Sequence, residues 1–356
     1  MGSNDLIKDM IKEIQQCSIK DIGIMEVCGT HTQAISKLGI RQLVKPNIML
    51  LSGPGCPVCV TSEAYLDAAI ELLQKPNVIL ATFGDMMRVK GTRENLTEQR
   101  EKGKDIRVLY SPLEVITIAE GNRDKEIVFL GVGFETTTPI IALAIKTSQA
   151  KNIRNISFLI GMKRMEPILH HILSDEHHKI RGLICPGHVA AVKGEEYFKF
   201  IVEQYNIPAV VAGFEALDIV FAIYFLMQQQ GQTKKIFKNL YKSCVTLQGN
   251  RKENDLMEEV FTDCVGQWRG IGNIQASGFS LREKYKNYDA AERFGIKLHQ
   301  KIIRTCICSD ILLGKKLPNS CEFFGRICKP EQAVGPCMVS SEGACSVFYR
   351  YKGNIV

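Results

Sequence analysis

The chain has 356 residues, of which 45% are hydrophobic and 23% are charged, and its formal net charge is +7. This is the balance of a globular protein with enough residues for two or three domains. The basic residues are scattered and their densest group lacks interleaved aromatic residues, so we expect a solvated helix face and no binding of nucleic acid. That group consists of Lys234, Lys235, Lys238 and Lys242.

The sequence contains no segment that we expect to enter a membrane. Residues 1–19 predict an amphipathic helix instead of a signal peptide, and the longest apolar run, near Ile219–Met227, is too short to span a bilayer. We therefore expect a cytoplasmic protein. In that reducing compartment, 13 cysteines favour metal or redox chemistry over a framework of disulfide bonds.

After the N-terminal helix, short β-rich runs alternate with glycine-punctuated polar loops and helical patterns. The runs form two sets separated near 121–125, and they predict strands at 22–27, 47–52, 78–82 and 106–109, then at 127–132, 156–160, 182–184 and 209–212. Such alternation is typical of parallel sheets covered by helices on both faces. We therefore predict an α/β protein with two small parallel-sheet domains, residues 20–122 and 123–230, and a cleft between them.

Beyond the second set the pattern changes. Helical segments of mixed charge run through Cys264 and Trp268, and closely spaced glycines indicate a linker or surface loop over 266–278. We predict a peripheral, helical and cysteine-rich third domain over residues 231–356, joined by the N-terminal helix 1–19.

Polar residues gather at the carboxyl ends of the predicted strands. In open parallel sheets, binding sites form outside these ends. Taken singly, each such residue is also explained by helix capping or turn formation. Because they recur at successive strand ends, we expect the following side chains to face a common cleft: Cys28, His31, Cys56, Cys59, Asp85, Glu135, Thr136, Thr137, Thr138, His188 and Glu215.

Two of these cysteines form a closely spaced pair. Cys56 and Cys59 lie in a loop that joins strand 47–52 to a helical pattern over 62–73. The positive end of a helix dipole stabilises thiolates, which bind soft metals, and the pair can also close to a disulfide. Half of a zinc site is the alternative for an isolated pair with this spacing.

The C-terminal segment is the second cysteine-rich signal. It contains four closely spaced cysteines among glycines and prolines: Cys321, Cys328, Cys337 and Cys345. Four thiolates suit either structural zinc or a [4Fe–4S] cluster. We favour the cluster, because the short C-x2-C hooks of zinc ribbons are absent here and aromatic neighbours can shield a cluster from water. Cys306 and Cys308, just upstream, are either a nearby redox pair or buried thiols.

In combination these motifs resemble those of the hydrogenase maturation protein family HypD over nearly the whole chain. The matching stretches are Cys28–Thr32 (CGTHT), Gly53–Cys59 (GPGCPVC), Phe83–Arg88 (FGDMMR), Gly133–Pro139 (GFETTTP), Cys185–Val189 (CPGHV), Trp268–Gly272 (WRGIG) and Cys337–Cys345 (CMVSSEGAC). Gln33 departs from the family pattern, because a second histidine is expected there.

The resemblance implies a scaffold protein for assembly of the Fe(CN)2CO unit of [NiFe] hydrogenases. It implies a HypC-type chaperone and a HypE-type cyanide donor as partners. Carried over to this sequence, it makes Cys28 the iron-binding thiol, with Cys56 and Cys59 as a second metal-binding or redox pair. It also implies that a [4Fe–4S] cluster is held by Cys321, Cys328, Cys337 and Cys345.

The chemistry of the cargo agrees with these residue types. Fe(II) that carries cyanide and carbonyl ligands needs soft thiolate donors and protection from water, and His31 lies one helical turn beyond Cys28. The diatomic ligands can accept hydrogen bonds at helix N-termini. For these contacts we predict Glu135, Thr136, Thr137 and His188.

We expect the cluster to supply electrons to this redox-active scaffold, and the free protein to be a monomer. Two other functions fit parts of the pattern. One is a stand-alone thiol–disulfide or iron–sulfur oxidoreductase that acts on a small molecule through Cys56 and Cys59. The other is a structural zinc protein with a nucleotide-type core, which the lack of a glycine-rich phosphate loop disfavours.

Overall fold

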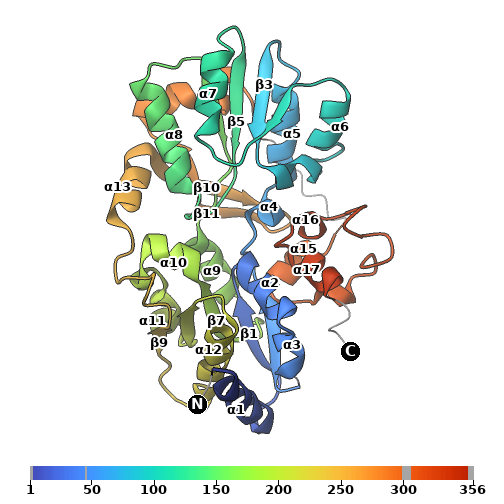
Figure 1. The fold of residues 1–356 in the computed structure, drawn as a ribbon, viewed down its shortest axis with the longest axis vertical. Coiled ribbons are helices and arrows are strands. Elements are labelled where there is room, and N and C mark those ends of the chain that lie inside the picture. The colour runs from blue at the N-terminus through green and yellow to red at the C-terminus, as the bar shows by residue number, and fades with distance from the viewer. Residues whose placement is uncertain (1–2, 45, 299–305, 352–356) are drawn as a thin grey trace. The chain divides into compact units, whose positions relative to one another are not determined.

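The computed structural model describes residues 3–44, 46–298 and 306–351, and it confirms the predicted α/β class (Figure 1). The chain forms two compact units. Unit 1 comprises Met1–Cys56, Leu169–Asn250 and Cys306–Val356, and unit 2 comprises Pro57–Ile168 and Arg251–Thr305. None of the helices in the described ranges is both long enough and apolar enough to cross a membrane.

Unit 1 is built on a five-stranded parallel sheet with the strand order β2–β1–β7–β8–β9. The strands are β1 (Ile22–Glu26), β2 (Ile48–Ser52), β7 (Ile180–Pro186), β8 (Ala209–Ala212) and β9 (Phe237–Asn239). β1 and β8 are buried at every position, which explains their continuous apolar sequences. The register pairs Glu26 with Ser52, so β1 and β2 end at the same level of the sheet.

The helices of unit 1 outside its cysteine-rich segment are α1 (Ser3–Gln16), α2 (Gly29–Lys37), α3 (Ile40–Leu43), α10 (Gly187–Lys193), η2 (Glu195–Phe198), α11 (Phe200–Tyr205) and α12 (Ala216–Gln228). α12 packs against β7 and β8, and its Ile219 and Ile223 share one buried cluster with Met10 and Ile14 of α1. We predicted that helix 1–19 joins residues 231–356. Its apolar face instead meets α12, because both helices have apolar side chains to bury on the same side of the sheet.

Unit 2 contains a four-stranded parallel sheet with the order β4–β3–β5–β6. The strands are β3 (Val78–Thr82), β4 (Ile106–Val108), β5 (Glu126–Gly131) and β6 (Ile156–Ile160). Its helices are α4 (Pro57–Val60), α5 (Glu63–Leu72), η1 (Gly84–Arg88), α6 (Leu96–Glu101), α7 (Glu114–Gly121), α8 (Thr138–Ala150), α13 (Arg251–Val260), η3 (Glu283–Tyr288) and α14 (Ala290–Phe294), and α9 (Met165–Leu173) begins in unit 2 and ends in unit 1.

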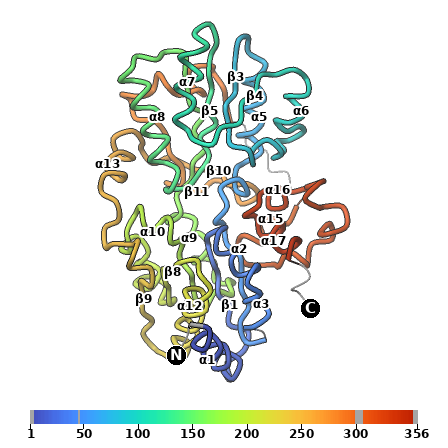
Figure 2. The backbone as a smooth tube through the Cα atoms, viewed as in Figure 1, coloured from blue at the N-terminus to red at the C-terminus, as the bar shows by residue number. Residues whose placement is uncertain are grey.

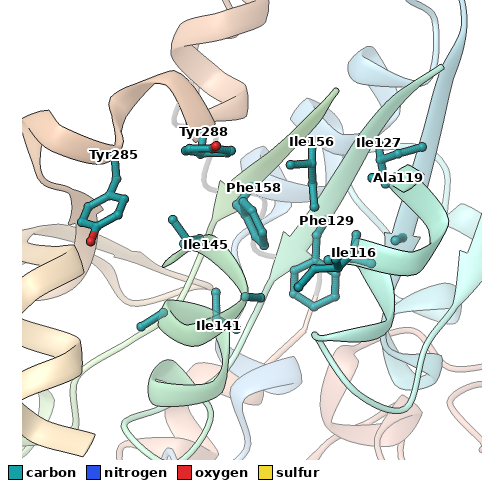
Figure 3. Close-up of a cluster of buried hydrophobic side chains, with 14 of the residues drawn as sticks. Ile116, Ala119, Ile127, Phe129, Ile141, Ile145, Ile156, Phe158, Tyr285 and Tyr288 are labelled. Atoms are coloured by element: carbon teal, nitrogen blue, oxygen red, sulfur yellow. The ribbon is translucent and has the colours of Figure 1, made fainter. Parts of the chain in front are cut away.

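Aromatic residues on neighbouring strands organise the core of unit 2. Phe129 of β5 is paired in register with Phe158 of β6, and their ring centroids are 6.0 Å apart in an edge-on arrangement. Figure 3 shows these rings on the side of the sheet where Ile116 of α7 and Ile145 of α8 also lie. The parallel sheet is therefore fixed by large buried side chains on the face that the helices cover.

Unit 2 also contains an antiparallel hairpin, β10 (Phe261–Trp268) and β11 (Gly272–Leu281). This corrects our prediction of helical segments followed by a surface loop over 266–278. The glycines allow a bulged hairpin with a tight turn: the register shifts between Cys264 and Gly266, and Gly272 has a φ of 115°. A side chain at Gly266 would come within 2.4 Å of Oγ of Ser277, so the two strands approach closely there.

The two sheets do not follow the predicted ranges 20–122 and 123–230. β3 and β4 from the first range pair with β5 and β6, whereas β7 and β8 from the second range belong to the sheet of β1 and β2. The break near 121–125 is only the turn between α7 and β5. Local periodicity predicts a strand, but the partner of that strand depends on contacts between distant parts of the chain.

The cysteine-rich end of the chain belongs to unit 1 and consists of short helices. They are α15 (Cys308–Leu312), η4 (Pro318–Ser320), α16 (Pro336–Val339) and α17 (Ala344–Arg350). Figure 2 shows them gathered in the red part of the backbone beside α2, and α17 contacts α2 directly. The helical, cysteine-rich character that we predicted for this region is therefore present.

Candidate functional site

Cys28 lies where β1 ends and α2 begins. It is the N-cap residue of α2, with an extended backbone, and only 8% of its surface is exposed. The loop after β2 packs directly onto it, since a side chain at Gly55 would come within 2.4 Å of the Cys28 nitrogen. The adjacent parallel strands β1 and β2 thus bring the segments of Cys28 and Cys56 together inside unit 1.

Burial controls the ionisation of Cys28. Loss of solvent raises the pKa of its thiol to about 11, and the nearby carboxylates of Glu26 and Glu342 act in the same direction. The backbone N–H groups of His31 and Thr30, at the start of α2, oppose this rise. Without a metal, Cys28 is therefore a neutral thiol, and a metal that binds there must displace a proton.

Glu26 lies beneath Cys28 in the sheet, and we did not predict it as a site residue. Its carboxylate accepts hydrogen bonds from Oγ1 of Thr32 at 2.6 Å and from the Cys28 nitrogen at 3.2 Å. Burial raises the pKa of this carboxyl to about 7, while the buried guanidinium of Arg41 lowers it. The sequence signal that could have identified Glu26 is a single acidic residue in an apolar strand, separated by one residue from the Cys-Gly-Thr-His motif.

His31 is fully buried, and its imidazole forms a hydrogen bond with a backbone carbonyl. Its Nε2 lies 2.9 Å from the carbonyl oxygen of Gly213, so Nε2 carries the proton that is donated. Burial lowers the pKa of His31 to about 4, which keeps the ring neutral. Its Nδ1 has no hydrogen-bond partner among the described residues and is the nitrogen that remains able to accept.

Phe214 connects His31 to His188. Its ring stacks on His31 with centroids 4.6 Å apart and on His188 with centroids 4.3 Å apart. These side chains follow β1, β7 and β8, so the carboxyl ends of three neighbouring strands meet here. Two of the predicted site residues, His31 and His188, are therefore brought together by an aromatic residue that we did not predict as part of the site.

Cys56 and Cys59 are both buried and both disulfide-bonded, whereas the other eleven cysteines are free. The turn of the β10–β11 hairpin holds the residues after Cys59. The Arg269 nitrogen donates to the carbonyl oxygen of Val60 at 3.0 Å, and Nε of Arg269 donates to that of Thr61 at 2.8 Å. The Trp-Arg-Gly-Ile-Gly motif thus anchors the segment that carries one cysteine of the pair.

Of the predicted residues after β5, Glu135 accepts a hydrogen bond at the start of a helix, whereas Thr137 forms no capping hydrogen bond through its side chain. Glu135 is buried and its Oε1 accepts a hydrogen bond from the Met165 nitrogen at 2.8 Å, at the start of α9. Thr137 is the N-cap residue of α8 and packs against Gly133, while Thr136 is exposed. All of them lie in unit 2, and their contact with ligands of iron stays a prediction.

The C-terminal cysteines surround one small pocket in unit 1. Its lining includes Cys306, Cys308, Cys321, Cys328 and Cys345, together with Phe323, Phe324 and Met338. Cys337 is fully buried beside it, and the neighbouring Cys308 thiol raises the pKa of Cys337. Cys306 and Cys308, which we left outside the ligand set, therefore belong to the same group of thiols.

These donors fit the chemistry of an iron–sulfur cluster, since soft thiols surround an apolar pocket. In the ranges that the structure describes, no group of three or more His, Cys, Asp or Glu side chains is placed to hold a metal ion.

A loop between two of these cysteines reaches the Cys28 helix. Oγ1 of Thr30 donates to Oε1 of Glu342 at 3.2 Å, and Nε2 of Gln33 donates to the carbonyl oxygen of Ser341 at 2.7 Å. Gly29 is required at this contact, because a side chain there would come within 2.5 Å of Cβ of Glu342. The group of C-terminal cysteines and Cys28 are thus joined by direct contacts inside unit 1.

Comparison with known proteins gives the family. The family model HypD, described as the hydrogenase formation hypA family, matches residues 5–352. The chain is 38% identical over 353 residues to hydrogenase maturation factor HypD of Rhodobacter capsulatus, which covers 98% of this chain and 94% of that relative. It is 36% identical over 350 residues to HypD of Escherichia coli, covering 97% and 93%, and 39% identical over 336 residues to HypD of Azotobacter vinelandii, covering 92% and 89%. The chain belongs to the HypD family of hydrogenase maturation factors.

Proposed function

We propose that this chain is the scaffold on which the Fe(CN)2CO unit of [NiFe] hydrogenases is assembled, with the iron bound through the Cys28 thiolate. The position of Cys28 is the observation that supports this most. Its thiol is buried at the N-terminus of α2, and the loop of Gly55 and Cys56 packs against it. A soft, water-shielded thiolate is the donor that Fe(II) with strong-field ligands requires.

Iron loading at Cys28 is coupled to proton release. The pKa of about 11 means that the thiol holds its proton near neutral pH, and the incoming iron must replace it. The backbone N–H of His31 contacts this thiol, and its neutral imidazole has a buried Nδ1 that can accept a hydrogen bond or bind the metal. We propose His188, Glu135, Thr136 and Thr137 as contacts for the diatomic ligands of the cargo.

We also propose a resident [4Fe–4S] cluster on four of the C-terminal thiols: Cys321, Cys328, Cys337 and Cys345. Their gathering around one apolar pocket supports this assignment. When bound, such a cluster supplies single electrons. The Cys56–Cys59 pair is the two-electron store of the proposal, since its reduction takes up two electrons and two protons and yields two thiols able to bind iron.

The partners that we propose are a HypC-type chaperone, which shares the iron at Cys28, and a HypE-type cyanide donor. We place the monomeric free protein and its complexes in the cytoplasm. The contacts among Cys28, Glu342 and the Cys56 loop support one docking region for the chaperone, because all three lie around the start of α2.

Complex formation tests the scaffold function. The anaerobic, iron-loaded chain is mixed with a HypC-type chaperone and analysed by size-exclusion chromatography. We expect a complex that Cys28→Ser weakens and that the matched control Cys244→Ser, at an exposed cysteine outside the site, leaves intact. Equal complex formation by both variants would remove Cys28 from the iron-binding role.

The disulfide-bonded state of Cys56 and Cys59 also fits a stand-alone thiol–disulfide oxidoreductase. That function predicts turnover of a small disulfide by the chain alone, lost in Cys56→Ser and unchanged by Cys28→Ser. The scaffold function instead predicts that Cys28→Ser weakens complex formation with the chaperone. The two variants therefore separate the two functions in one assay series.

A further inference from the structure

Besides the pocket of the C-terminal cysteines in unit 1, a pocket lies in unit 2 at the carboxyl end of β6. It takes no part in the function proposed above. Its volume is about 380 Å³, and it lies where the segment after β6 meets β11. This is near the lower end of pockets that hold small molecules, which are about 300–1,000 Å³. The polar side chains in its lining are Ser62, Tyr65, Lys163, Cys264, Gln267, Asn273, Ser280 and Asp289.

Lys163 is held rigidly in the wall of this pocket. Its backbone nitrogen donates to the carbonyl oxygen of Gly133 at 2.9 Å, and its backbone is bridged to Gly278 of β11 on the other side. Only 6% of the residue is exposed. The ammonium group is therefore fixed at a strand end, the position where open parallel sheets bind ligands.

The Lys163 ammonium makes fewer hydrogen bonds than it can donate. Nζ donates one hydrogen bond, to the carbonyl oxygen of Gly161 at 2.9 Å, although an ammonium has three donors. Among the residues that the structure describes, no carboxylate forms an ion pair with it. A buried cation without an anion is unfavourable. Accordingly, burial lowers the pKa of Lys163 to about 8, and Cys264 is the neighbour that opposes this change.

The one carboxylate in the pocket lining is committed elsewhere. Oδ1 of Asp289 accepts hydrogen bonds from the nitrogens of Ala291 at 2.8 Å and Glu292 at 3.2 Å, and so caps α14. Apart from Lys163 and the Cys264 thiol, the remaining polar side chains of the lining are amides and hydroxyls, which can donate hydrogen bonds to an anion. The protein thus offers a fixed cation in a small pocket and leaves its counter-charge to be supplied from outside.

We propose that this pocket binds a small oxyanion, a carboxylate or a phosphate, through Nζ of Lys163. Both kinds of ligand accept charge-assisted hydrogen bonds from an ammonium. The site is separate from the iron chemistry proposed for Cys28, so either can fail without the other.

Binding to the full-length protein tests this site. Inorganic phosphate and acetate are titrated separately by isothermal calorimetry into wild type, Lys163→Met, Lys163→Arg and the control Lys146→Met. Lys146 lies in the same unit and pairs with Glu259 at 2.6 Å. We expect one site per chain, weakened at least about tenfold in Lys163→Met, as for loss of a hydrogen bond to a charged group, and largely kept in Lys163→Arg and Lys146→Met.

A measurement on the wild type alone covers the case in which a variant does not fold. Reductive methylation is followed residue by residue by mass spectrometry, with and without each anion. A bound anion should slow methylation of Lys163 and not of Lys146. Binding of phosphate only, of acetate only or of both supports the site and identifies the ligand chemistry. No 1:1 binding of either anion, unchanged affinity in Lys163→Met or unchanged methylation of Lys163 would overturn it.

Discussion

Replacing Arg269 by methionine tests how the structure holds the segment that carries Cys59. The Arg269 side chain is only 9% exposed and forms an ion pair with Glu63, whose side chain is 15% exposed, with an Nε–Oε1 distance of 3.4 Å. It also donates to the carbonyl oxygens of Thr61 and Lys90. Methionine keeps most of the side-chain volume and removes the charge and all of these donors.

The expected loss of stability follows from the Glu63 carboxylate, which the substitution leaves without its ion-pair partner. Removing one partner of a buried, hydrogen-bonded ion pair costs about 3–5 kcal/mol, largely because the other charge stays buried. Glu63 is not completely buried, so we expect about 3 kcal/mol of lost unfolding free energy, at the lower end of that range. If the unpaired carboxylate causes much of this loss, Glu63→Gln combined with Arg269→Met should recover about 1 kcal/mol or more.

The chain carries its own reporter for this measurement. Trp268 is the single tryptophan, it is 2% exposed, and it precedes Arg269 in the hairpin turn. Urea unfolding followed by its fluorescence therefore reports on this part of unit 2. The matched control is Arg107→Met, which breaks an exposed pair with Asp105 and should cost less than about 1 kcal/mol. Equal midpoints for the two variants would show that Arg269 does not anchor the Cys59 segment.

Three further predictions follow from the site. Below its unfolded-state pKa of 4.5, Glu26 favours the folded state, and this contribution is lost as the pH rises through the folded value of about 7. The unfolding free energy of Glu26→Gln relative to wild type should therefore be higher at pH 8 than at pH 5, by up to about 3 kcal/mol, as measured by urea unfolding at both pH values. A difference that does not change with pH would contradict the burial of a titrating carboxyl. Alkylation of the denatured protein without reductant should modify eleven cysteines and leave Cys56 and Cys59 unmodified until dithiothreitol is added, as counted by mass spectrometry. If the proposed [4Fe–4S] cluster forms on anaerobic reconstitution, its visible absorbance should disappear in Cys328→Ser and persist in Cys306→Ser, and the reverse result would reassign the ligands.

Strands β1 to β8 could be predicted from the sequence, because each is a short apolar run followed by a polar loop and a helical pattern, whereas β9 was not predicted. The assignment of the strands to sheets could not be predicted. β7 joins β1 although more than a hundred residues separate them, and no local pattern encodes such a pairing. The β10–β11 hairpin was missed for a related reason: Gly266 and Gly272 serve a bulge and a turn, and in sequence they resemble a loop.

Motif residues at strand ends were predicted, and their supporting residues were not. Phe214 packs between two histidines, and Glu342 reaches α2 from the far end of the chain. Both contacts depend on which strand ends and loops become neighbours. Cys306 and Cys308 were undecided because spacing along the chain does not show whether two thiols enter a pocket formed by later cysteines.

Infrared spectroscopy of the anaerobic complex with the proposed HypC-type chaperone tests the proposed iron scaffold most directly. Cyanide and carbonyl bound to iron give stretching bands in a spectral region that is free of protein absorption. The scaffold function predicts that these bands are present in the wild-type complex and in Cys244→Ser, and absent in Cys28→Ser. Bands of full intensity in Cys28→Ser would show that the iron is held elsewhere and would contradict the assembly function proposed for this chain.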